Sequence, residues 1–367
     1  MTIAGARPNF MKVAPFLNKI ADFNTQKKTD TPPIQSLLVH TGQHYDENMS
    51  EIFFKELGIQ CPDINLCVGS GSHAVQTAKI LVSFESACEG EKPDWVVVVG
   101  DVNSTLACAL VCSKIGIRIA HIEAGLRSFD RTMPEEINRI VTDALSNLLF
   151  TPSNDADNNL LHEGIPRDRI KLVGNIMIDA LLENLQKARR SDILSQYHLE
   201  PLRFVYVTLH RPSNVDWNTN LLTIMNIMEH VAKDYPVIFP IHPRTRKMLC
   251  ESGLFPRGIE NKLLLLDPIG YHGSLCLTEN ARLILTDSGG LQEEATYFRT
   301  PCLTLRPNTE RPITVTLGSN RLTNIERLQN DINEILNGPE RIGQIPPLWD
   351  GKTAKRVLND ILSASHE

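Results

Sequence analysis

Residues 95–101 read Trp95-Val96-Val97-Val98-Val99-Gly100-Asp101, an unbroken apolar run that ends in a glycine and an acid. Such a run is typical of a strand buried on both faces of a parallel sheet. The apolar stretch Ala107–Cys112 follows, and a second buried run, Ile117–Ile122, ends at Glu123. Two buried strands with a helical connection between them predict a βαβ unit.

The same alternation of short β-branched runs and longer amphipathic segments extends in both directions along the chain. Helical patterns such as Glu136–Leu148, Leu221–Lys233 and Leu291–Phe298 separate the predicted strands. The strands are expected at Thr2–Ala6, Ser36–His40, Trp95–Gly100, Ile117–Ile122, Leu148–Thr151, Lys171–Val173, Phe204–Leu209, Val237–Ile241, Leu263–Leu266, Arg282–Thr286 and Cys302–Leu305. This order predicts an α/β protein with doubly wound parallel sheets.

The alternation breaks once, at a long polar helical piece between residues 178 and 203. Together with a length of 367 residues, this break predicts two Rossmann-like domains that face a central cleft. The expected parts are an N-terminal domain over 1–175, a connecting helical segment over 176–203, a C-terminal domain over 204–350 and a last helix over 351–367.

Composition and charge narrow the class of protein. Apolar residues make up 42% and charged residues 22% of the chain, and 37 basic against 43 acidic residues give a net charge of −6. No tract of like charges indicates nucleic-acid binding, and no apolar run is long enough to cross a bilayer. Since no signal peptide precedes the first strand and the 8 cysteines form no Cys-x-x-Cys pair, we expect a soluble cytoplasmic protein with free thiols.

Chemistry is expected where parallel strands end, because ligands of open α/β sheets bind at the carboxyl edge. The first strand runs into Arg7-Pro8-Asn9-Phe10-Met11-Lys12. Pro8 suits the first turn of a helix, and two cations beside a helix N-terminus favour an anion there. A solvated basic turn is the alternative interpretation.

Three carboxylates follow strands of the first half. Asp101 is a candidate acid/base group or a helix cap, and Glu123 is a candidate acid/base group or the structural partner of Arg127. Glu135 lies three residues after Thr132, so a capping box competes with a catalytic role there. Carboxylates that converge on one sheet edge are suited to proton transfer.

The second half supplies groups of the opposite charge. His210 and His242 each follow a predicted strand, and Arg311 lies in Thr309-Glu310-Arg311-Pro312. The segment Asp287-Ser288-Gly289-Gly290 opens a helix whose backbone amides suit a phosphate, and Glu294 lies one turn in, within reach of ribose hydroxyls. This asymmetry between the halves predicts a nucleotide-activated substrate.

Other motifs carry little weight. Gly69-Ser70-Gly71-Ser72-His73-Ala74 matches the dinucleotide fingerprint, but no strand that ends in an acid follows at the required distance. The P-loop and the Gly-x-Ser-x-Gly elbow are both absent from the sequence.

Ten short segments in fixed order carry a family resemblance. They are Gly5–Lys12, Gly42–His44, Gly100-Asp101, His121–Arg127, Pro134–Arg139, Gly174-Asn175, His210-Arg211, His242-Pro243, Asp287–Glu294 and Glu310–Pro312. In this order they resemble the non-hydrolysing UDP-N-acetylglucosamine 2-epimerases, from residue 2 to about residue 320. The resemblance implies a glycosyltransferase-B-like fold.

The resemblance also implies roles for individual residues. Asp101, Glu123, Glu135 and His210 match catalytic positions. The positions that bind the UDP-sugar are matched by Arg7, Lys12, His242, Ser288, Gly289, Gly290, Glu294 and Arg311, and a candidate effector site for UDP-N-acetylglucosamine by Gln43, His44 and Glu136. The implied partners are a UDP-sugar and a second copy of the chain, with no metal, no other cofactor, no nucleic acid and no membrane.

The implied reaction is reversible C2 epimerisation of UDP-N-acetylglucosamine (UDP-GlcNAc) to UDP-N-acetylmannosamine (UDP-ManNAc), in surface polysaccharide biosynthesis. It proceeds by anti elimination of UDP to 2-acetamidoglucal and re-addition. The alternatives are a hydrolysing epimerase that releases ManNAc and UDP, an epimerase of a UDP-diacetamido sugar, a glycosyltransferase of the same fold and a non-catalytic UDP-sugar-binding regulator.

Two segments depart from the pattern of the family. Pro212-Ser213-Asn214 follows His210-Arg211, where many relatives carry a glutamate. Residues 68–73 lack the glutamine-containing loop of relatives that are regulated by UDP-GlcNAc at a second site.

Overall fold

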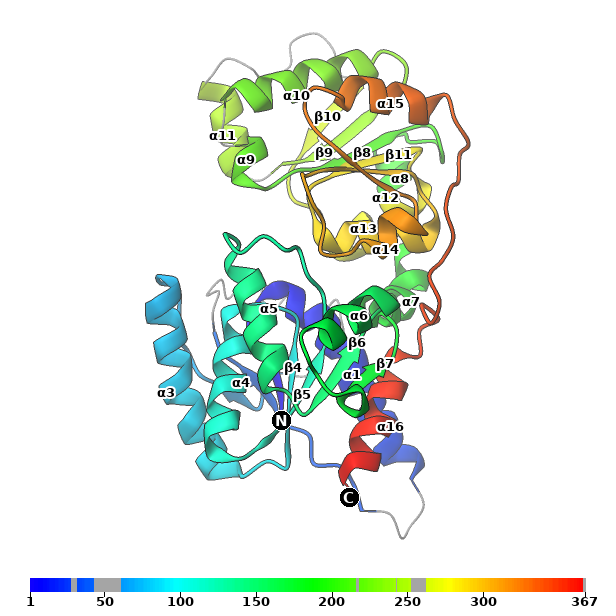
Figure 1. Cartoon of the computed structure of the whole chain (residues 1–367). Helices are drawn as coiled ribbons and strands as arrows, with labels where there is room; N and C mark the ends of the chain where they lie inside the picture. The colour runs from blue at the N-terminus through cyan, green and yellow to red at the C-terminus, as the bar shows by residue number, and fades with distance from the viewer. Residues whose placement is uncertain (28–31, 43–60, 216–217, 242, 252–261, 366–367) are drawn as a thin grey trace. The chain divides into compact units, whose positions relative to one another are not determined.

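A computed structural model of the chain describes all residues except 28–31, 43–60, 216–217, 242, 252–261 and 366–367. The chain divides into two compact units. Unit 1 comprises Met1–Glu183 and Pro347–Glu367, and unit 2 comprises Asn184–Pro346 (Figure 1). The division falls inside helix α7, Ile176–Ala188, which lies in the expected connecting segment.

Unit 1 is a parallel sheet with helices on both faces, as the alternation of strands and helices predicts. The strands are β1 Thr2–Ala4, β2 Leu38–His40, β3 Ile64–Asn65, β4 Trp95–Val99, β5 Arg118–Ile122, β6 Leu148–Thr151 and β7 Ile170–Leu172, in the spatial order β3-β2-β1-β4-β5-β6-β7. The helices are α1 Arg7–Gln26, α3 His73–Glu91, α4 Asn103–Ile115, α5 Pro134–Leu145, α6 Asn154–His162, α7 and α16 Thr353–Ser365, with a 3₁₀ turn at Arg167–Arg169.

Unit 2 repeats this architecture. Its strands are β8 Val205–Thr208, β9 Val237–Pro240, β10 Leu263–Leu266, β11 Leu283–Thr286, β12 Cys302–Leu305 and β13 Asn320–Thr323, in the order β10-β9-β8-β11-β12-β13. Its helices are α8 Ile193–Gln196, α9 Pro212–Val215, α10 Asn218–Val231, α11 Pro243–Glu251, α12 Tyr271–Asn280, α13 Gly289–Phe298, α14 Ile313–Thr316 and α15 Leu328–Leu336. Both sheets therefore confirm the predicted doubly wound α/β class.

Each sheet contains a switch point, where the chain order reverses. In unit 1 it lies between β1 and β4, which pair in parallel with Thr2 opposite Val97. In unit 2 it lies between β8 and β11, where Thr208 is opposite Thr286. Ligands of doubly wound sheets bind outside the carboxyl ends of the strands at such points. The residues after β1, β4, β8 and β11 are therefore the first to examine.

Two edge strands, β3 and β13, lie outside the predicted set. Ile64 is half-buried and Asn65 exposed, and β13 reads Asn320-Arg321-Leu322-Thr323. Neither segment has the continuous apolar pattern of a central strand, because a sheet edge has only one neighbouring strand and is partly exposed.

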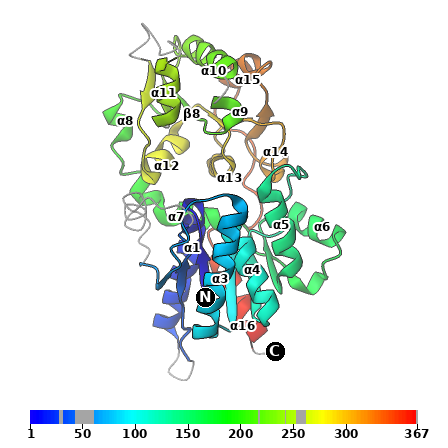
Figure 2. The same ribbon diagram turned by 90° about the vertical axis from the view of Figure 1, so that its left-hand side faces the viewer.

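The last segment of the chain returns to unit 1, where α16 packs beside α1 (Figure 2). The Asp179 carboxylate accepts hydrogen bonds from the amides of Thr353 (3.2 Å) and Ala354 (2.8 Å), and so satisfies free N–H groups in the first turn of α16. The Trp349 indole donates to the Pro152 carbonyl at 3.3 Å. Three elements of unit 1 are thus tied together by the chain terminus.

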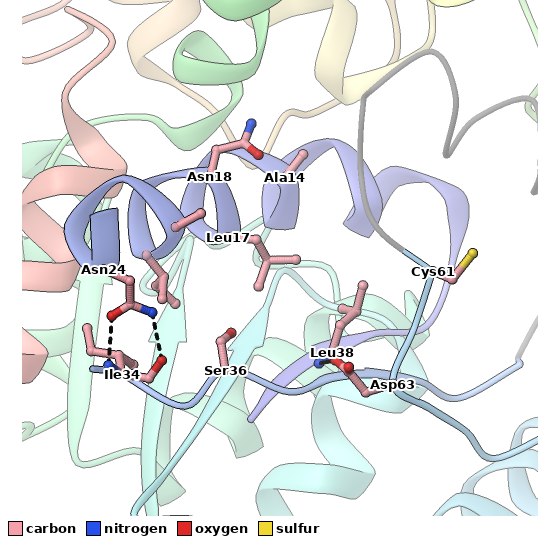
Figure 3. Close-up of a pocket in the computed structure, with 11 residues that line it drawn as sticks. Ala14, Leu17, Asn18, Asn24, Ile34, Ser36, Leu38, Cys61 and Asp63 are labelled. Carbon is pink, nitrogen blue, oxygen red and sulfur yellow. Dashed lines mark hydrogen bonds between the residues drawn. The ribbon is translucent and has the colours of Figure 1, made fainter. Parts of the chain in front are cut away.

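A pocket of about 320 Å³ lies between α1 and the strand edge at β2 (Figure 3). The Asn24 side chain lies at one end of it and exchanges two hydrogen bonds with the Ile34 backbone, at 2.8 and 2.9 Å. Asp63 accepts from the Leu38 amide at 2.7 Å. None of the described residues that line it is among the predicted site residues, and these polar groups serve to hold the edge of the sheet.

Gly174, between β7 and α7, provides a test of this packing. It has φ of +91°, and a Cβ atom there would lie 2.2 Å from the Leu348 carbonyl oxygen. Gly174→Ala should lower the free energy of unfolding by about 1–3 kcal/mol from backbone strain alone. Urea unfolding followed by tryptophan fluorescence measures it. The control is Gly90→Ala, in the last turn of α3 with no atom near the added Cβ, and an equal loss in both variants would contradict the explanation.

Candidate active site

The switch point of unit 1 holds a buried ion pair between Lys12 and Glu123. Lys12 lies in α1, one turn beyond the start of the helix, and Glu123 is the first residue after β5. The Lys12 ammonium contacts the Glu123 carboxylate, and each residue is only 7% exposed. Arg7, whose side chain is outside the description, is the first residue of α1. The sequence placed Lys12 and Glu123 at the same edge but did not predict that they pair.

Two backbone features hold Glu123 in place. Its φ is +72°, a left-handed conformation that is rare for a residue with a side chain, and its amide donates to the Phe150 carbonyl at 3.1 Å. Gly100 lies against the pair, since a Cβ there would be 3.1 Å from Lys12 Nζ and 3.3 Å from Glu123 Oε2. Strained residues of this kind cluster at functional sites.

The alternative partner of Glu123, Arg127, is engaged elsewhere. Its guanidinium binds Asp143 at 2.7 Å and forms a two-point contact with Glu163 at 2.6 and 2.7 Å. Burial alone lowers the pKa of Arg127, but these two carboxylates raise it above its ordinary value. The structural Glu123–Arg127 pair is therefore not formed.

Asp101, directly after the glycine that follows β4, contacts Arg139 of α5. Its carboxylate is 2.6 Å from Arg139 Nη1, and the side chain is 30% exposed. It does not cap the next helix, because the N-cap position of α4 is occupied by Val102. Asp101 thus keeps an accessible face while a cation fixes its orientation.

Glu135 and Glu136, adjacent in α5, differ completely in environment. Glu135 is exposed. The predicted capping box does not form, because Met133 is the N-cap residue and the Thr132 hydroxyl donates to Asp130 at 2.6 Å. Glu135 is left available for chemistry.

Glu136, by contrast, is 1% exposed and fully occupied by its own chain. Its carboxylate accepts from the Ser128 amide and hydroxyl (both 3.0 Å), the Phe129 amide (2.8 Å) and Arg139 Nε (3.0 Å). It holds the loop before α5. The other two candidate effector residues, Gln43 and His44, lie outside the described residues, as does His242.

In unit 2, His210 follows β8 and contacts the buried Asp287, which follows β11. His210 Nδ1 is 2.8 Å from Asp287 Oδ1, with the histidine side chain 61% exposed and the aspartate fully buried. Burial alone raises the pKa of Asp287, but hydrogen bonds from His210, Asn214 and the Arg211 amide hold it below its ordinary value. A carboxylate on Nδ1 leaves Nε2 as the nitrogen that meets a ligand.

Asp287 is a functional residue that the sequence reasoning did not select. It appears in the quoted motif, but the role of a strand-end acid beside a strand-end histidine depends on β8 and β11 being neighbours. Asn214, in the segment that departs from the family pattern, donates to the same carboxylate at 2.9 Å. The adjacent strands therefore share one acid as an anchor.

The first turn of α13 is built for close approach. Ser288 is the N-cap residue, and its amide donates to the Thr286 hydroxyl at 3.0 Å. At Gly289 a Cβ would lie 2.7 Å from Arg311 Nη1 and 2.9 Å from Glu310 Oε1. A side chain is excluded there, so the small residues Ser288, Gly289 and Gly290 bring the helix N-terminus directly beside Arg311.

Arg311 is held by carboxylates that the sequence did not single out. Its Nε is 2.8 Å from Glu293, its Nη1 contacts Glu310, and Glu310 also binds Arg306 at 2.7 Å. Burial alone raises the pKa of Glu310, but the two arginines hold it well below its ordinary value. This network fixes the guanidinium at the helix N-terminus, where it reinforces an anion site.

Glu294, predicted to reach ribose hydroxyls, is only 5% exposed. Burial and the neighbouring Glu293 raise the pKa of Glu294 to about 8, and a hydrogen bond with Tyr271 offsets part of the rise. At neutral pH its carboxyl is therefore mostly protonated, and it can donate as well as accept a hydrogen bond.

Comparison with known proteins places these features in one family. The sequence profile described as UDP-N-acetylglucosamine 2-epimerase matches residues 26–362. The chain is 44% identical over 367 aligned positions to the UDP-N-acetylglucosamine 2-epimerase of Methanocaldococcus jannaschii. The alignment covers 97% of this chain and 96% of that protein. The chain belongs to the UDP-N-acetylglucosamine 2-epimerase family.

A solved structure and one further relative are also similar to this chain. A crystal structure of the M. jannaschii UDP-GlcNAc 2-epimerase in complex with UDP-GlcNAc and UDP matches with a TM-score of 0.86 at 43% identity, covering 99% of each chain. The UDP-2,3-diacetamido-2,3-dideoxy-D-glucuronate 2-epimerase of Pseudomonas aeruginosa is 42% identical over 330 residues, 89% of this chain and 88% of that protein. The family resemblance and the glycosyltransferase-B-like fold class expected from the motifs are confirmed.

The raised pKa of Glu294 predicts how stability depends on pH. Between about pH 4.5 and pH 8 the unfolded chain loses this proton while the folded chain keeps it. The free energy of unfolding should therefore fall as pH rises through this window. Glu294→Gln, which is neutral at every pH, should lose less stability between pH 5 and pH 8.5 than the wild type in urea unfolding. The exposed Glu200→Gln is the control, and identical profiles for Glu294→Gln and the wild type would refute the assignment.

Proposed function

We propose that this chain catalyses the reversible C2 epimerisation of UDP-GlcNAc to UDP-ManNAc. The observation that carries the proposal is the chemistry at the two switch points. Unit 1 has the carboxylates Glu123 and Asp101 there, each oriented by a cation, and unit 2 has His210 and the first turn of α13. The carboxylates of unit 1 are suited to proton transfer, and the histidine and helix N-terminus of unit 2 are suited to binding a diphosphate. Membership of the family supports the same substrate.

The chemistry follows from the position of the hydrogen that must be exchanged. C2 of the sugar is not adjacent to a ketone, so its proton cannot be removed by simple enolisation. Instead a base removes the C2 proton while the C1–O bond breaks anti to it and UDP leaves with the electron pair. The intermediate is 2-acetamidoglucal. A proton then adds to the opposite face of C2, the UDP oxygen adds to C1, and the reaction is balanced without a redox step.

Protons must be handled on both faces of C2, which explains the need for several carboxylates. In this proposal Asp101, Glu123 and Glu135 are the acid/base groups. Asp101 and Glu123 are held in position by Arg139 and Lys12. Glu135 is exposed, and its carboxylate is not engaged in a capping box.

The leaving diphosphate gains charge as the C1–O bond breaks, so preorganised donors stabilise the transition state. We assign this role to His210, backed by Asp287, and to the amides of Ser288, Gly289 and Gly290. The UDP moiety would be bound by Arg7, Lys12, His242, Glu294 and Arg311. Of these, Arg311 is already held beside the helix N-terminus by Glu293 and Glu310.

The nature of the product separates this proposal from its neighbours. Purified protein incubated with UDP-GlcNAc in water should form UDP-ManNAc up to a stable mixture, resolved by anion-exchange chromatography and mass spectrometry. Free ManNAc with UDP would indicate a hydrolysing epimerase. Turnover of UDP-2,3-diacetamido-2,3-dideoxy-D-glucuronate with none of UDP-GlcNAc would place the chain with its P. aeruginosa relative and contradict the proposed substrate.

The first prediction from the proposal concerns Glu123. Glu123→Gln removes the acid/base function but keeps the shape of the side chain, so formation of UDP-ManNAc should fall by about 10²–10⁴-fold. UDP affinity, measured by calorimetry, should stay within about threefold of that of the wild type. Retained UDP binding also shows that the variant is folded. The matched control is Glu85→Gln on the exposed face of α3. Near-normal turnover by Glu123→Gln would remove Glu123 from the mechanism.

We also propose that the protein acts in the cytoplasm as a homodimer. All eight cysteines are free thiols, as in proteins of a reducing compartment, and within the described residues no helix has the length and apolarity to cross a membrane. Helix α3 lies at the outside of unit 1 (Figure 1). Three exposed apolar side chains of this helix are separated by three and four residues and so lie on one face: Val75 (49% exposed), Ala78 and Val82 (69% exposed). Such a surface suits contact with a second copy of the chain.

The dimer proposal predicts the effect of a charge on α3. Val82→Asp should shift the mass measured by analytical ultracentrifugation from a dimer to a monomer, because a buried unpaired charge opposes association. The control, Glu89→Gln on an exposed position of the same helix, should remain dimeric. A wild-type chain that is monomeric at micromolar concentration, or a Val82→Asp variant that stays dimeric, would contradict the assignment.

A further inference from the structure

Behind the Lys12–Glu123 pair lies a second buried cluster, which the proposed mechanism does not use. It consists of His121 in β5, Asp143 in α5 and Arg127, whose guanidinium also reaches the exposed Glu163. His121 and Asp143 are completely buried, and Arg127 is 2% exposed. Buried ionisable groups that are fully hydrogen-bonded are costly to assemble, so their arrangement calls for an explanation.

Hydrogen-bond geometry places a hydrogen on one ring nitrogen of His121. Its Nδ1 is 2.7 Å from Asp143 Oδ1, and its Nε2 is 2.9 Å from the Gly100 carbonyl oxygen. A backbone carbonyl can only accept, so Nε2 carries the hydrogen of that contact.

Two further donors show that Asp143 is ionised. Its second oxygen accepts from Arg127 Nη1 at 2.7 Å and from the Gly125 amide at 3.1 Å. Burial alone raises the pKa of Asp143, but His121 and Arg127 hold it below its ordinary value. Arg127 also forms a two-point contact with the exposed Glu163.

The cluster is attached to Glu123 from both sides. His121 holds the Gly100 carbonyl, and Gly100 lies directly against Lys12 Nζ and Glu123 Oε2. Asp143 holds the Gly125 amide, two residues beyond Glu123, where φ is +79° and a Cβ would lie 2.5 Å from the Ala156 carbonyl oxygen. Glu123 keeps its left-handed backbone between these two anchored glycines.

We propose that His121 acts as a positioning residue for Glu123, through its hydrogen bond to the Gly100 carbonyl. The proposal rests on the acid/base role of Glu123 given above. His121 touches no reacting atom. Its ring is held by Asp143, and its Nε2–H fixes the peptide against which the Lys12–Glu123 pair is packed.

The proton on Nε2 is tested by nitrogen NMR, independently of activity. Long-range ¹H–¹⁵N correlation spectra of the full chain labelled at histidine show which ring nitrogen carries a hydrogen. The His121 signals, assigned by their loss in His121→Gln, should show a protonated Nε2 at pH 7.5. The exposed His162 is the internal control. A His121 ring whose Nε2 carries no hydrogen would overturn the proposal.

The positioning role is tested by separating kcat from binding. His121→Gln should lower kcat for UDP-ManNAc formation by about 10²-fold, since a misplacement near 1 Å costs that much, while UDP affinity stays within about twofold. His162→Gln should change neither. An unchanged kcat, or equal losses of kcat and UDP affinity, would overturn the positioning role.

Asp143→Asn keeps the test decisive if His121→Gln does not fold. With an amide at position 143, His121 can still donate Nε2–H to Gly100, so kcat should fall by less than about tenfold. A larger fall would contradict the role of the Gly100 contact. Should Glu123→Gln itself prove active, the acid/base assignment fails, whereas the NMR result still decides whether Nε2 carries the hydrogen.

Discussion

The buried attraction between Lys12 and Glu123 is the interaction on which the first switch point depends. Neither charge can stay buried alone, because removing one partner of such a pair costs about 3–5 kcal/mol. The pair requires a lysine one turn into α1 and a carboxylate at the end of β5, so it ties the first helix of the chain to a strand more than a hundred residues later. It also demands a glycine at position 100, where any side chain would meet both charges.

Unit 2 also pairs each functional charge with a buried opposite charge, but there the functional groups are basic and their partners are acidic. There the groups that would face a diphosphate are His210 and Arg311, and each is backed by an acid with little or no exposure to solvent. Asp287 supports the imidazole, while Glu293 and Glu310 support the guanidinium. In both units, charges that act on a ligand are held by opposite charges that do not. This arrangement orients the acting groups before substrate arrives, which is the basis of electrostatic preorganisation.

The fold was largely predictable because its signal is local. The continuous apolar runs of β4, β5, β11 and β12 identify buried parallel strands, and the order of strands and helices identifies the class. The edges were not predictable in this way: β3 and β13 are short or polar because they are less covered. The sequence pattern predicted a connecting segment only as broad as residues 176–203, and the exact division inside α7 carries no local signal.

For the site, the sequence located residues better than it located their partners. Asp101, Glu123 and His210 all lie just beyond strands beside a switch point, as strand-end reasoning predicts. The pairs Lys12–Glu123, Asp101–Arg139 and His210–Asp287 join residues far apart in the chain, so no local spacing encodes them. The helix-capping roles weighed for Asp101 and Glu135 were wrong, because Val102 and Met133 take the N-cap positions. The residue types at these positions favour helix capping, but in the folded chain Asp101 instead pairs with Arg139 and Glu135 is exposed.

The most direct measurement of the central claim is proton NMR of the protein with UDP-GlcNAc in deuterium oxide. Elimination and re-addition must exchange the C2 hydrogen with solvent at each turnover, whichever face receives it. We predict that the C2 proton signal disappears from both UDP-GlcNAc and UDP-ManNAc as the mixture reaches its stable ratio, with no free sugar formed. UDP-ManNAc that retains the original C2 proton would contradict proton transfer at C2, and with it the roles given to Glu123 and Asp101.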